Sequence, residues 1–160
     1  MICLDACIIG HVIAPDISLV PVKEIEASKT LVNQIIENKL SACSTVILIA
    51  EVKWLISRVA KRKNIEDYLE RVDEAESLLP QTLGRSFKFI NVDFAIAALA
   101  ADYRLEHYSK KNTFSYNDGI YLATASLTGC DALITTDSHL LAVSDVPVFT
   151  PSAFLARKNQ

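Results

Sequence analysis

Short apolar runs alternate with longer segments of helical periodicity along the chain, and this alternation restricts the fold more than any other feature. The predicted strands are residues 2–5, 41–43, 87–92, 132–135 and 146–150. Most of these runs are apolar throughout, so both faces of their sheet must be covered. Strands followed by helices in this order predict an α/β fold, with a parallel sheet between layers of helices.

The segments between these strands have the spacing of amphipathic or buried helices. The predicted helices are residues 21–40, 45–60, 65–79, 94–107 and 115–129. Thr45, Asp93 and Ser115 are the expected N-caps, because their side chains accept hydrogen bonds from backbone N–H groups of the first turn. Gly129 is expected to end the last helix, since glycine tolerates a positive φ.

The C-terminal part is predicted to hold an edge strand and then a tail. Pro147 lies within the run 146–150 and has no N–H for a ladder hydrogen bond, which places that strand at an edge. Residues 151–160 are expected to form a tail. With 160 residues, of which 51% are apolar, the chain is long enough for one compact domain, predicted over residues 1–150.

Charge and hydropathy exclude several classes of protein. Sixteen Lys and Arg face nineteen Asp and Glu, a net charge of -3, so nucleic-acid binding must come from local basic patches. The longest uncharged run, residues 119–130, is shorter than the roughly 18 to 20 residues of a membrane-spanning helix. The apolar N-terminal segment has no basic region and is interrupted by Asp5, unlike a signal peptide. A cytoplasmic location is therefore predicted.

Cysteine, histidine and glycine spacing excludes further chemistry. The four cysteines show neither zinc-site spacing nor the density of a disulfide scaffold, so they are interpreted as reduced thiols. The three histidines are not spaced as zinc ligands. The four glycines include no dinucleotide-binding or phosphate-loop motif.

Two acids follow predicted strands, where parallel sheets bind their ligands. Asp5 ends the first strand, and Asp137 follows the fourth. Both carboxylates are expected at the same edge of the sheet. An alternative interpretation is that Asp137 or Thr136 only caps a short helix that follows.

Two further acids lie on predicted helices. Glu51 is the only acid in the apolar run 46–55, where an ionised carboxylate needs a partner. That partner is either a cation in a site or Arg58, seven residues further along. Asp118 follows Ser115 in the pattern of a capping box, so it either caps its helix or joins the other acids. Four carboxylates in one cleft would repel one another unless Mg²⁺ or Mn²⁺ neutralised them.

Over nearly its whole length the chain resembles the PIN-domain ribonucleases, most closely their VapC-like toxin branch. The matching pieces are Asp5 after the first strand, Glu51 within LIAEV, Asp118 opening NDGIYLATA, and Asp137 in TTD. The alanine-rich helix after Asp93 also resembles the family. The resemblance implies a PIN-like three-layer sandwich, with a central parallel sheet of four to five strands flanked by helices.

The resemblance also implies roles for these residues. Asp5, Asp118 and Asp137 would bind Mg²⁺ or Mn²⁺, Glu51 would do so directly or through water, and Thr135 would support the site. The implied activity is metal-dependent endonucleolytic hydrolysis of RNA through these four catalytic acids. A VapBC-type toxin would also be a homodimer whose acidic cleft is covered by an antitoxin.

The chain departs from the family at two positions. Cys7 stands where the family usually has Ser, Thr or Asn, and His139 stands where some members have a further acid. Both changes affect the expected metal geometry and whether one or two ions bind.

Several residues are candidates for contacts with substrate. Arg58, Lys110 and Lys111 are predicted to provide positive charge for RNA phosphates, and the last two precede the helix of Asp118. Trp54, Tyr116 and Tyr121 could stack on bases, but aromatic residues on apolar helices belong more often to the core. These three are therefore left out of the predicted site.

Two other functions fit the pattern less well. The alternative is a PIN domain that serves RNA processing, as a nuclease or a non-catalytic scaffold, without a toxin role, although an unused cluster of acids only lowers stability. A phosphoaspartate protein would also place Asp at strand ends. The phosphatase pattern Asp-x-Asp is not met by Asp5, Ala6 and Cys7.

Overall fold

A five-stranded parallel sheet forms the centre of the protein, as the sequence predicts. The computed structural model describes residues 1–63, 70, 72–73, 76, 83–109 and 113–158. The strands are β1 (Ile2–Leu4), β2 (Ala42–Thr45), β3 (Phe87–Ile90), β4 (Ala132–Ile134) and β5 (Val148–Phe149). Their order across the sheet is β3-β2-β1-β4-β5, so β1 is central. Ile2 pairs with Ala42 on one side and with Ala132 on the other.

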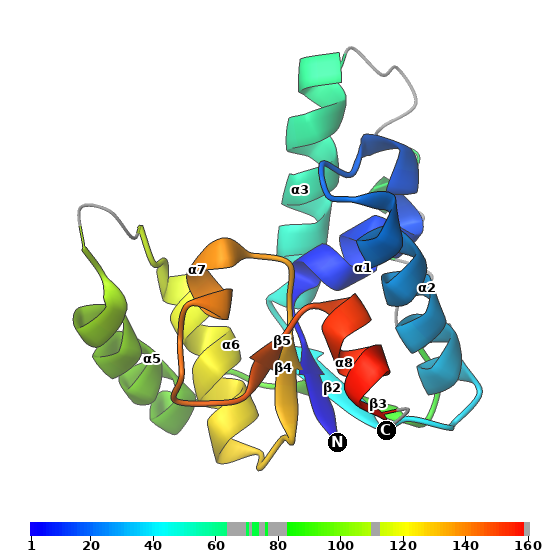
Figure 1. Cartoon of the computed structure of the whole chain (residues 1–160). Helices are drawn as coiled ribbons and strands as arrows, with labels where there is room; N and C mark the ends of the chain where they lie inside the picture. Colours follow the sequence, from blue (N-terminus) through cyan, green and yellow to red (C-terminus); the bar gives the residue numbers. More distant parts are fainter. Residues whose placement is uncertain (64–69, 71, 74–75, 77–82, 110–112, 159–160) are drawn as a thin grey trace.

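Helices cover both faces of this sheet, which gives the three layers of the predicted α/β fold (Figure 1). The described helices are α1 (Ala6–Ile13), the 3-10 helix η1 (Pro15–Ile17), α2 (Val22–Ile36), α3 (Leu48–Lys63), α5 (Phe94–His107), α6 (Tyr116–Leu127), α7 (Ser138–Leu141) and α8 (Pro151–Lys158). Helices α5 and α6 lie on one side of the sheet, and α1, α2 and α8 lie on the other. Helix α3 contacts α1 and extends beyond the strands.

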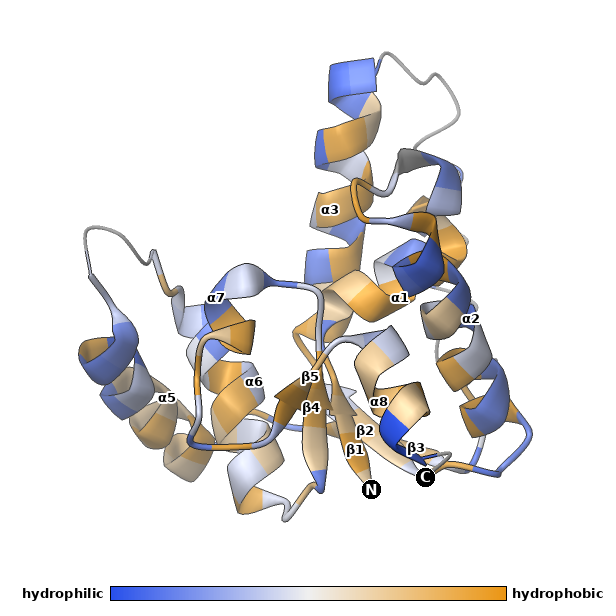
Figure 2. Ribbon diagram, in the orientation of Figure 1, coloured by the Kyte–Doolittle hydropathy of each residue, from blue (hydrophilic) through white to orange (hydrophobic). Residues whose placement is uncertain are grey.

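The strands are apolar because both of their faces are packed. All three residues of β1 and all three of β4 are buried. Figure 2 shows these strands in the hydrophobic colours, whereas α2 and α5 carry hydrophilic segments. Among the described residues, no helix combines the length and the apolarity needed to cross a bilayer.

Two helices differ from the sequence predictions, and a third cannot be compared with them. Helix α1 was not predicted, because its residues are apolar on almost every side and show no helical period. Helix α3 begins at Leu48 and continues to Lys63, whereas Thr45 ends β2 instead of capping the helix. The predicted helix 65–79 falls largely outside the described residues.

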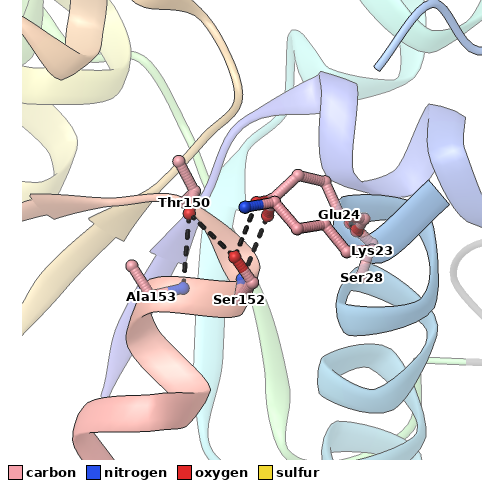
Figure 3. Close-up of polar contacts among 6 residues, drawn as sticks. All are labelled: Lys23, Glu24, Ser28, Thr150, Ser152 and Ala153. Carbon is pink, nitrogen blue, oxygen red and sulfur yellow. Dashed lines mark hydrogen bonds and ion pairs between the residues drawn. The ribbon is translucent and has the colours of Figure 1, made fainter. Parts of the chain in front are cut away.

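The prediction of a tail over residues 151–160 is also wrong, since residues Pro151–Lys158 form helix α8. This helix contacts α2 and β5. The buried Glu24 of α2 accepts hydrogen bonds from the Ser152 backbone N–H at 3.0 Å and the Ser152 hydroxyl at 2.6 Å (Figure 3). A carboxylate at a helix N-terminus satisfies unpaired N–H groups and interacts favourably with the helix dipole. Glu24 thereby fastens the C-terminal helix to the domain.

Glu24→Gln is expected to lower the free energy of unfolding by about 1 to 3 kcal/mol, because it replaces one accepting oxygen with an amide donor and removes the charge. Urea denaturation of the variant measures the loss. Glu26→Gln is the matched control, since Glu26 lies exposed on the same helix and forms a surface ion pair with Lys29. Equal losses in the two variants would contradict the role given to Glu24.

Candidate metal centre

Four acids from four different elements line one cavity of about 620 Å³ at the carboxyl ends of the strands. Asp5 directly follows β1, and Asp137 follows β4. Glu51 lies in the first turn of α3, and Asp118 lies in the first turn of α6. The structure therefore brings together the four residues that the sequence singles out. Their role as metal ligands stays a prediction.

Asp5 is the most buried member of this group, with 8% of its surface exposed. The Thr135 hydroxyl donates a hydrogen bond to Oδ2 of Asp5 at 2.5 Å. Burial, together with the charges of Glu51 and Asp137, raises the pKa of Asp5 from 3.8 to about 6, against the hydrogen bonds from Thr135 and Cys7, which lower it. Asp5 is thus a carboxylate that gains from a nearby cation.

Cys7 takes part in the hydrogen bonding of the site. Its thiol donates to Oδ2 of Asp5 at 3.1 Å, and its sulfur accepts from the Thr136 backbone N–H at 3.3 Å. Burial and the Asp5 charge hold the pKa of Cys7 well above its ordinary value, so the thiol keeps its proton. Cys7 therefore supplies a donor where the family usually has a hydroxyl or an amide.

Asp118 forms the capping box that the sequence predicts, and it also lines the cavity. The Ser115 N–H donates to Oδ2 of Asp118 at 2.6 Å, and the Asp118 N–H donates to the Ser115 hydroxyl at 3.1 Å. Burial raises the pKa of Asp118, whereas the Ser115 hydrogen bonds lower it. Capping and site membership are compatible, because a carboxylate has two oxygens.

Glu51 has no ion pair with Arg58, so that alternative for the acid is wrong. Instead, Nδ2 of Asn117 donates a hydrogen bond to Oε1 of Glu51 at 2.5 Å. Arg58 instead lies over the ring of Trp54. Burial raises the pKa of Glu51, whereas the nearby Tyr121 hydroxyl and the Asn117 hydrogen bond lower it. Glu51 is thus a half-buried acid that faces the cavity and has an amide partner.

Asp137 caps α7, as its alternative interpretation proposes, and lines the cavity as well. Its Oδ1 accepts from the His139 N–H at 2.7 Å. The Thr135 hydroxyl accepts from the Asp137 N–H at 2.9 Å while it donates to Asp5. Thr135 therefore links the ends of β1 and β4, which agrees with its predicted supporting position.

The remaining predicted residues differ in their placement. Arg58 lines the cavity, whereas Lys110 and Lys111 lie outside the described residues. Trp54 and Tyr121, which the sequence prediction left out of the site, line the cavity, and Asn117, which it did not single out, contacts Glu51. The spacing of Tyr121, three positions after Asp118 and so on the same helix face, was an available signal.

The chemistry of the four acids fits a hard divalent cation. Their charges repel one another across one cavity. Within the described part of the chain, no Lys or Arg forms an ion pair with any of them. Mg²⁺ and Mn²⁺ prefer oxygen ligands, and either ion would provide the positive charge that the cavity acids need.

The spacing of the acids also indicates how an ion would be held. Among the described residues, one trio has its potential ligand atoms within 4.8 Å of one another, namely Glu106, His107 and Asp145, and it lies outside the cavity. The cavity acids are not as closely grouped. A cation between them would keep water among its ligands, as Mg²⁺ commonly does in proteins.

The buried Asp5 carboxyl is expected to give the stability of the protein a specific pH dependence. Because the folded-state pKa of about 6 lies above 3.8, the folded protein binds this proton more tightly than the unfolded chain. The contribution of the Asp5 carboxyl to the free energy of unfolding is fully present below pH 3.8 and is lost as the pH rises through about 6. The loss in the free energy of unfolding should be about 3 kcal/mol by neutral pH.

Asp5→Asn isolates this contribution, because the amide does not titrate. His11 acts in the opposite sense, since burial lowers its pKa from 6.5 to about 4, so the wild-type curve alone mixes both groups. The quantity to measure is the difference between variant and wild type in urea unfolding with EDTA, from acid to neutral pH. Between acid and neutral pH, the free energy of unfolding of Asp5→Asn should rise by about 3 kcal/mol relative to that of the wild type. A difference independent of pH would contradict the raised pKa.

Comparison with known proteins agrees with this geometry. A model of the PIN domain family matches residues 2–146, a span that contains all four acids. The chain belongs to the PIN domain family. This result confirms the family resemblance drawn from the sequence. A search of curated proteins finds no match to this PIN domain.

Solved structures show the same fold. FitAcB from Neisseria gonorrhoeae is 22% identical with a TM-score of 0.62, covering 94% of this PIN domain chain and 98% of its own. A toxin-antitoxin complex from Klebsiella pneumoniae is 21% identical with a TM-score of 0.58 and the same coverages. VapBC2 from Rickettsia felis, bound to a DNA fragment from its promoter, is 16% identical with a TM-score of 0.61, covering 93% and 98%. At these identities the likeness establishes the shared PIN fold.

Proposed function

We propose that this PIN domain is an endoribonuclease that hydrolyses RNA phosphodiester bonds with Mg²⁺ or Mn²⁺. The observation that carries the proposal is the convergence of Asp5, Glu51, Asp118 and Asp137 on one cavity without a Lys or Arg ion pair among the described residues. Such an arrangement lowers stability unless a cation is bound, so it is expected where the cation has a use.

Each side chain of the cavity has a distinct part in this proposal. Asp5, Asp118 and Asp137 would hold the ion, and Glu51 would do so directly or through water. When bound, the cation lowers the pKa of a water and stabilises the charge on the leaving oxygen. Thr135 fixes the orientation of Asp5 through its hydrogen bond, and Asn117 does the same for Glu51. Arg58 provides positive charge for a substrate phosphate at the rim.

We further propose that the protein is the toxin of a VapBC-type toxin-antitoxin pair. The support is the structural likeness to a toxin-antitoxin complex and to VapBC2. In this proposal an antitoxin covers the acidic cavity, the toxin forms a homodimer, and both act in the cytoplasm. Induced synthesis of the wild-type chain should arrest bacterial growth, whereas Asp118→Asn should not.

Cleavage of a mixed pool of structured and single-stranded RNAs tests the nuclease proposal. Purified protein is assayed with Mg²⁺, with Mn²⁺ and with EDTA, beside Asp118→Asn, whose amide oxygen can still accept from Ser115. Cutting should require the metal and be lost in the variant. Cutting that survives EDTA or the substitution would contradict the proposal.

A parallel thermal unfolding series separates two kinds of failure. A metal ion that binds the folded state raises the unfolding temperature by mass action. If the temperature rises but no RNA is cut, the substrate is more selective than the pool provides. If neither the rise in unfolding temperature nor RNA cleavage occurs, the results favour a non-catalytic scaffold over an enzyme.

A further inference from the structure

Trp54 is exposed beside the acidic cavity, although the sequence predicts it in the core. The buried positions of α3 are Leu48, Val52, Ile56 and Ala60. Trp54 lies on another side of the helix with 56% of its surface exposed. A large aromatic ring that keeps more than half of its surface exposed beside a cavity is a candidate contact surface for a ligand.

Arg58 completes a flat, positively charged unit with this ring. Its guanidinium carbon is 4.4 Å from the centre of the Trp54 ring, which is the distance of a cation–π contact. The exposed fraction of Trp54 shows that ring surface stays accessible in the presence of Arg58. A planar partner can therefore stack on the ring while the guanidinium binds a neighbouring anion.

This unit belongs to the same cavity as the four acids. Glu51, Trp54 and Arg58 all line it, at positions i, i+3 and i+7 of α3, and so on one face of the helix. At about 1.5 Å of rise per residue, Trp54 is about 5 Å and Arg58 about 10 Å along the axis from Glu51. The next turn carries Lys61, Arg62 and Lys63, so charge along α3 changes from acidic at the cavity to basic at its end.

This gradient suits a nucleic-acid strand better than an acidic or apolar partner. The acids repel phosphates that are not neutralised by a metal, while the basic end attracts the adjoining ones. Nucleobases stack on aromatic side chains when they are free of their own helix, which is the case in single-stranded RNA. The aromatic ring and the basic residues are thus placed in the order that one strand requires.

We propose that Trp54 and Arg58 form a subsite for single-stranded RNA, in which Trp54 stacks on a nucleobase and Arg58 binds the adjoining phosphate. The subsite rests on the proposed function in that RNA is the substrate. It goes beyond that function by naming the two residues that position the strand next to the four acids.

Trp54 is the only tryptophan in the chain, so its fluorescence reports directly on this subsite. Short single-stranded oligoadenylate is titrated against the wild-type protein in EDTA and against Asp118→Asn with Mg²⁺, so that RNA binding is measured without cleavage. Saturable quenching is expected with the single strand and not with the same strand in a duplex. Binding detected by anisotropy without quenching, or no binding at all, would overturn the subsite.

Substitutions provide the second test, measured as anisotropy of labelled oligoadenylate. Trp54→Leu should weaken binding about tenfold or more, and Trp54→Phe much less, because the ring is kept. Arg58→Ala should reduce the slope of log affinity against log salt concentration by about 1, the value expected for one lost phosphate contact. Arg58→Lys should preserve the slope of the wild type. Phe94→Leu is the control, since Phe94 is 88% exposed on α5 and does not line the cavity.

These outcomes are separate from those of the nuclease test. RNA that quenches Trp54, in a protein that neither cuts the RNA pool nor responds to metal in thermal unfolding, would support the subsite and contradict the enzyme. RNA that is cut with metal while Trp54→Leu keeps wild-type affinity would support the enzyme and overturn the subsite, which would leave the exposed ring to a protein partner. Thermal unfolding of each variant confirms that it is folded before binding is compared.

Discussion

Asp5→Asn is expected to reduce metal-dependent RNA cleavage by at least about 100-fold. Loss of a partner of a metal ligand already lowers metal affinity or activity about 10- to 100-fold, so loss of a charged ligand should cost more. The amide has the shape of the carboxylate and keeps an oxygen that can accept from Thr135 and Cys7, so the fold should survive. Single-turnover cleavage rates with saturating protein measure the effect.

The same variant should lose most of the rise in unfolding temperature that Mg²⁺ or Mn²⁺ produces in the wild-type protein. Asp102→Asn is the matched control, because Asp102 lies exposed on α5 and does not line the cavity. It should keep both the cleavage rate and the response to metal. Wild-type cleavage by Asp5→Asn would show that the chemistry takes place elsewhere.

Gly119→Ala is expected to have the largest effect on stability. A Cβ at Gly119 would lie 2.5 Å from the backbone oxygen of Ala100 and 3.2 Å from two further backbone atoms of that residue. Ala100 belongs to α5, so the clash is with the backbone of a neighbouring helix. A change of side-chain rotamer cannot relieve it. Helices α5 and α6 must separate, which should lower the free energy of unfolding by at least about 3 kcal/mol.

Gly10→Ala makes the matched comparison for this loss. Gly10 also lies within a helix, but its Cβ would meet only Cδ1 of Leu55, at 3.9 Å. Alanine should therefore stabilise α1 by about 0.5 to 1 kcal/mol through its higher helix propensity. Urea denaturation should show a lower free energy of unfolding for Gly119→Ala and a higher one for Gly10→Ala than for the wild type. Similar stability in the two variants would contradict the close approach of α5 and α6.

Much of the sheet could be predicted from the sequence because its strands are buried on both faces. Their apolar runs stand out from the surrounding helices, and Pro147 marks the edge strand. Helix α6 could be predicted from its capping box, which the structure contains. Helix α1 could not, since an apolar helix such as the one around Ile8 and Ile9 has no polar face to set its period.

The part of the candidate site that lies at the ends of strands could be predicted from the sequence. Asp5 and Asp137 follow parallel strands, and the carboxyl ends of such strands share one edge. The placement of Trp54 could not be predicted, because the run 46–55 is apolar on most sides and does not indicate which face of the helix is buried. In the structure the buried face carries Leu48, Val52, Ile56 and Ala60, which leaves Trp54 on another side. The Asn117 contact with Glu51 joins two helices and has no signal in the spacing within either one.

The central position of β1 also bears on how the chain is made. This strand leaves the ribosome before both of its partners, which follow about 40 and about 130 residues later, as the pairs of Ile2 with Ala42 and Ala132 show. Pairing across such separations is slow and costs chain entropy before it gives stability. A nascent or prematurely terminated chain that lacks Asp137 therefore holds three of the four acids beside an unfinished sheet. Translation must pass most of the message before a complete cavity can exist, so truncated products of synthesis are expected to be inert.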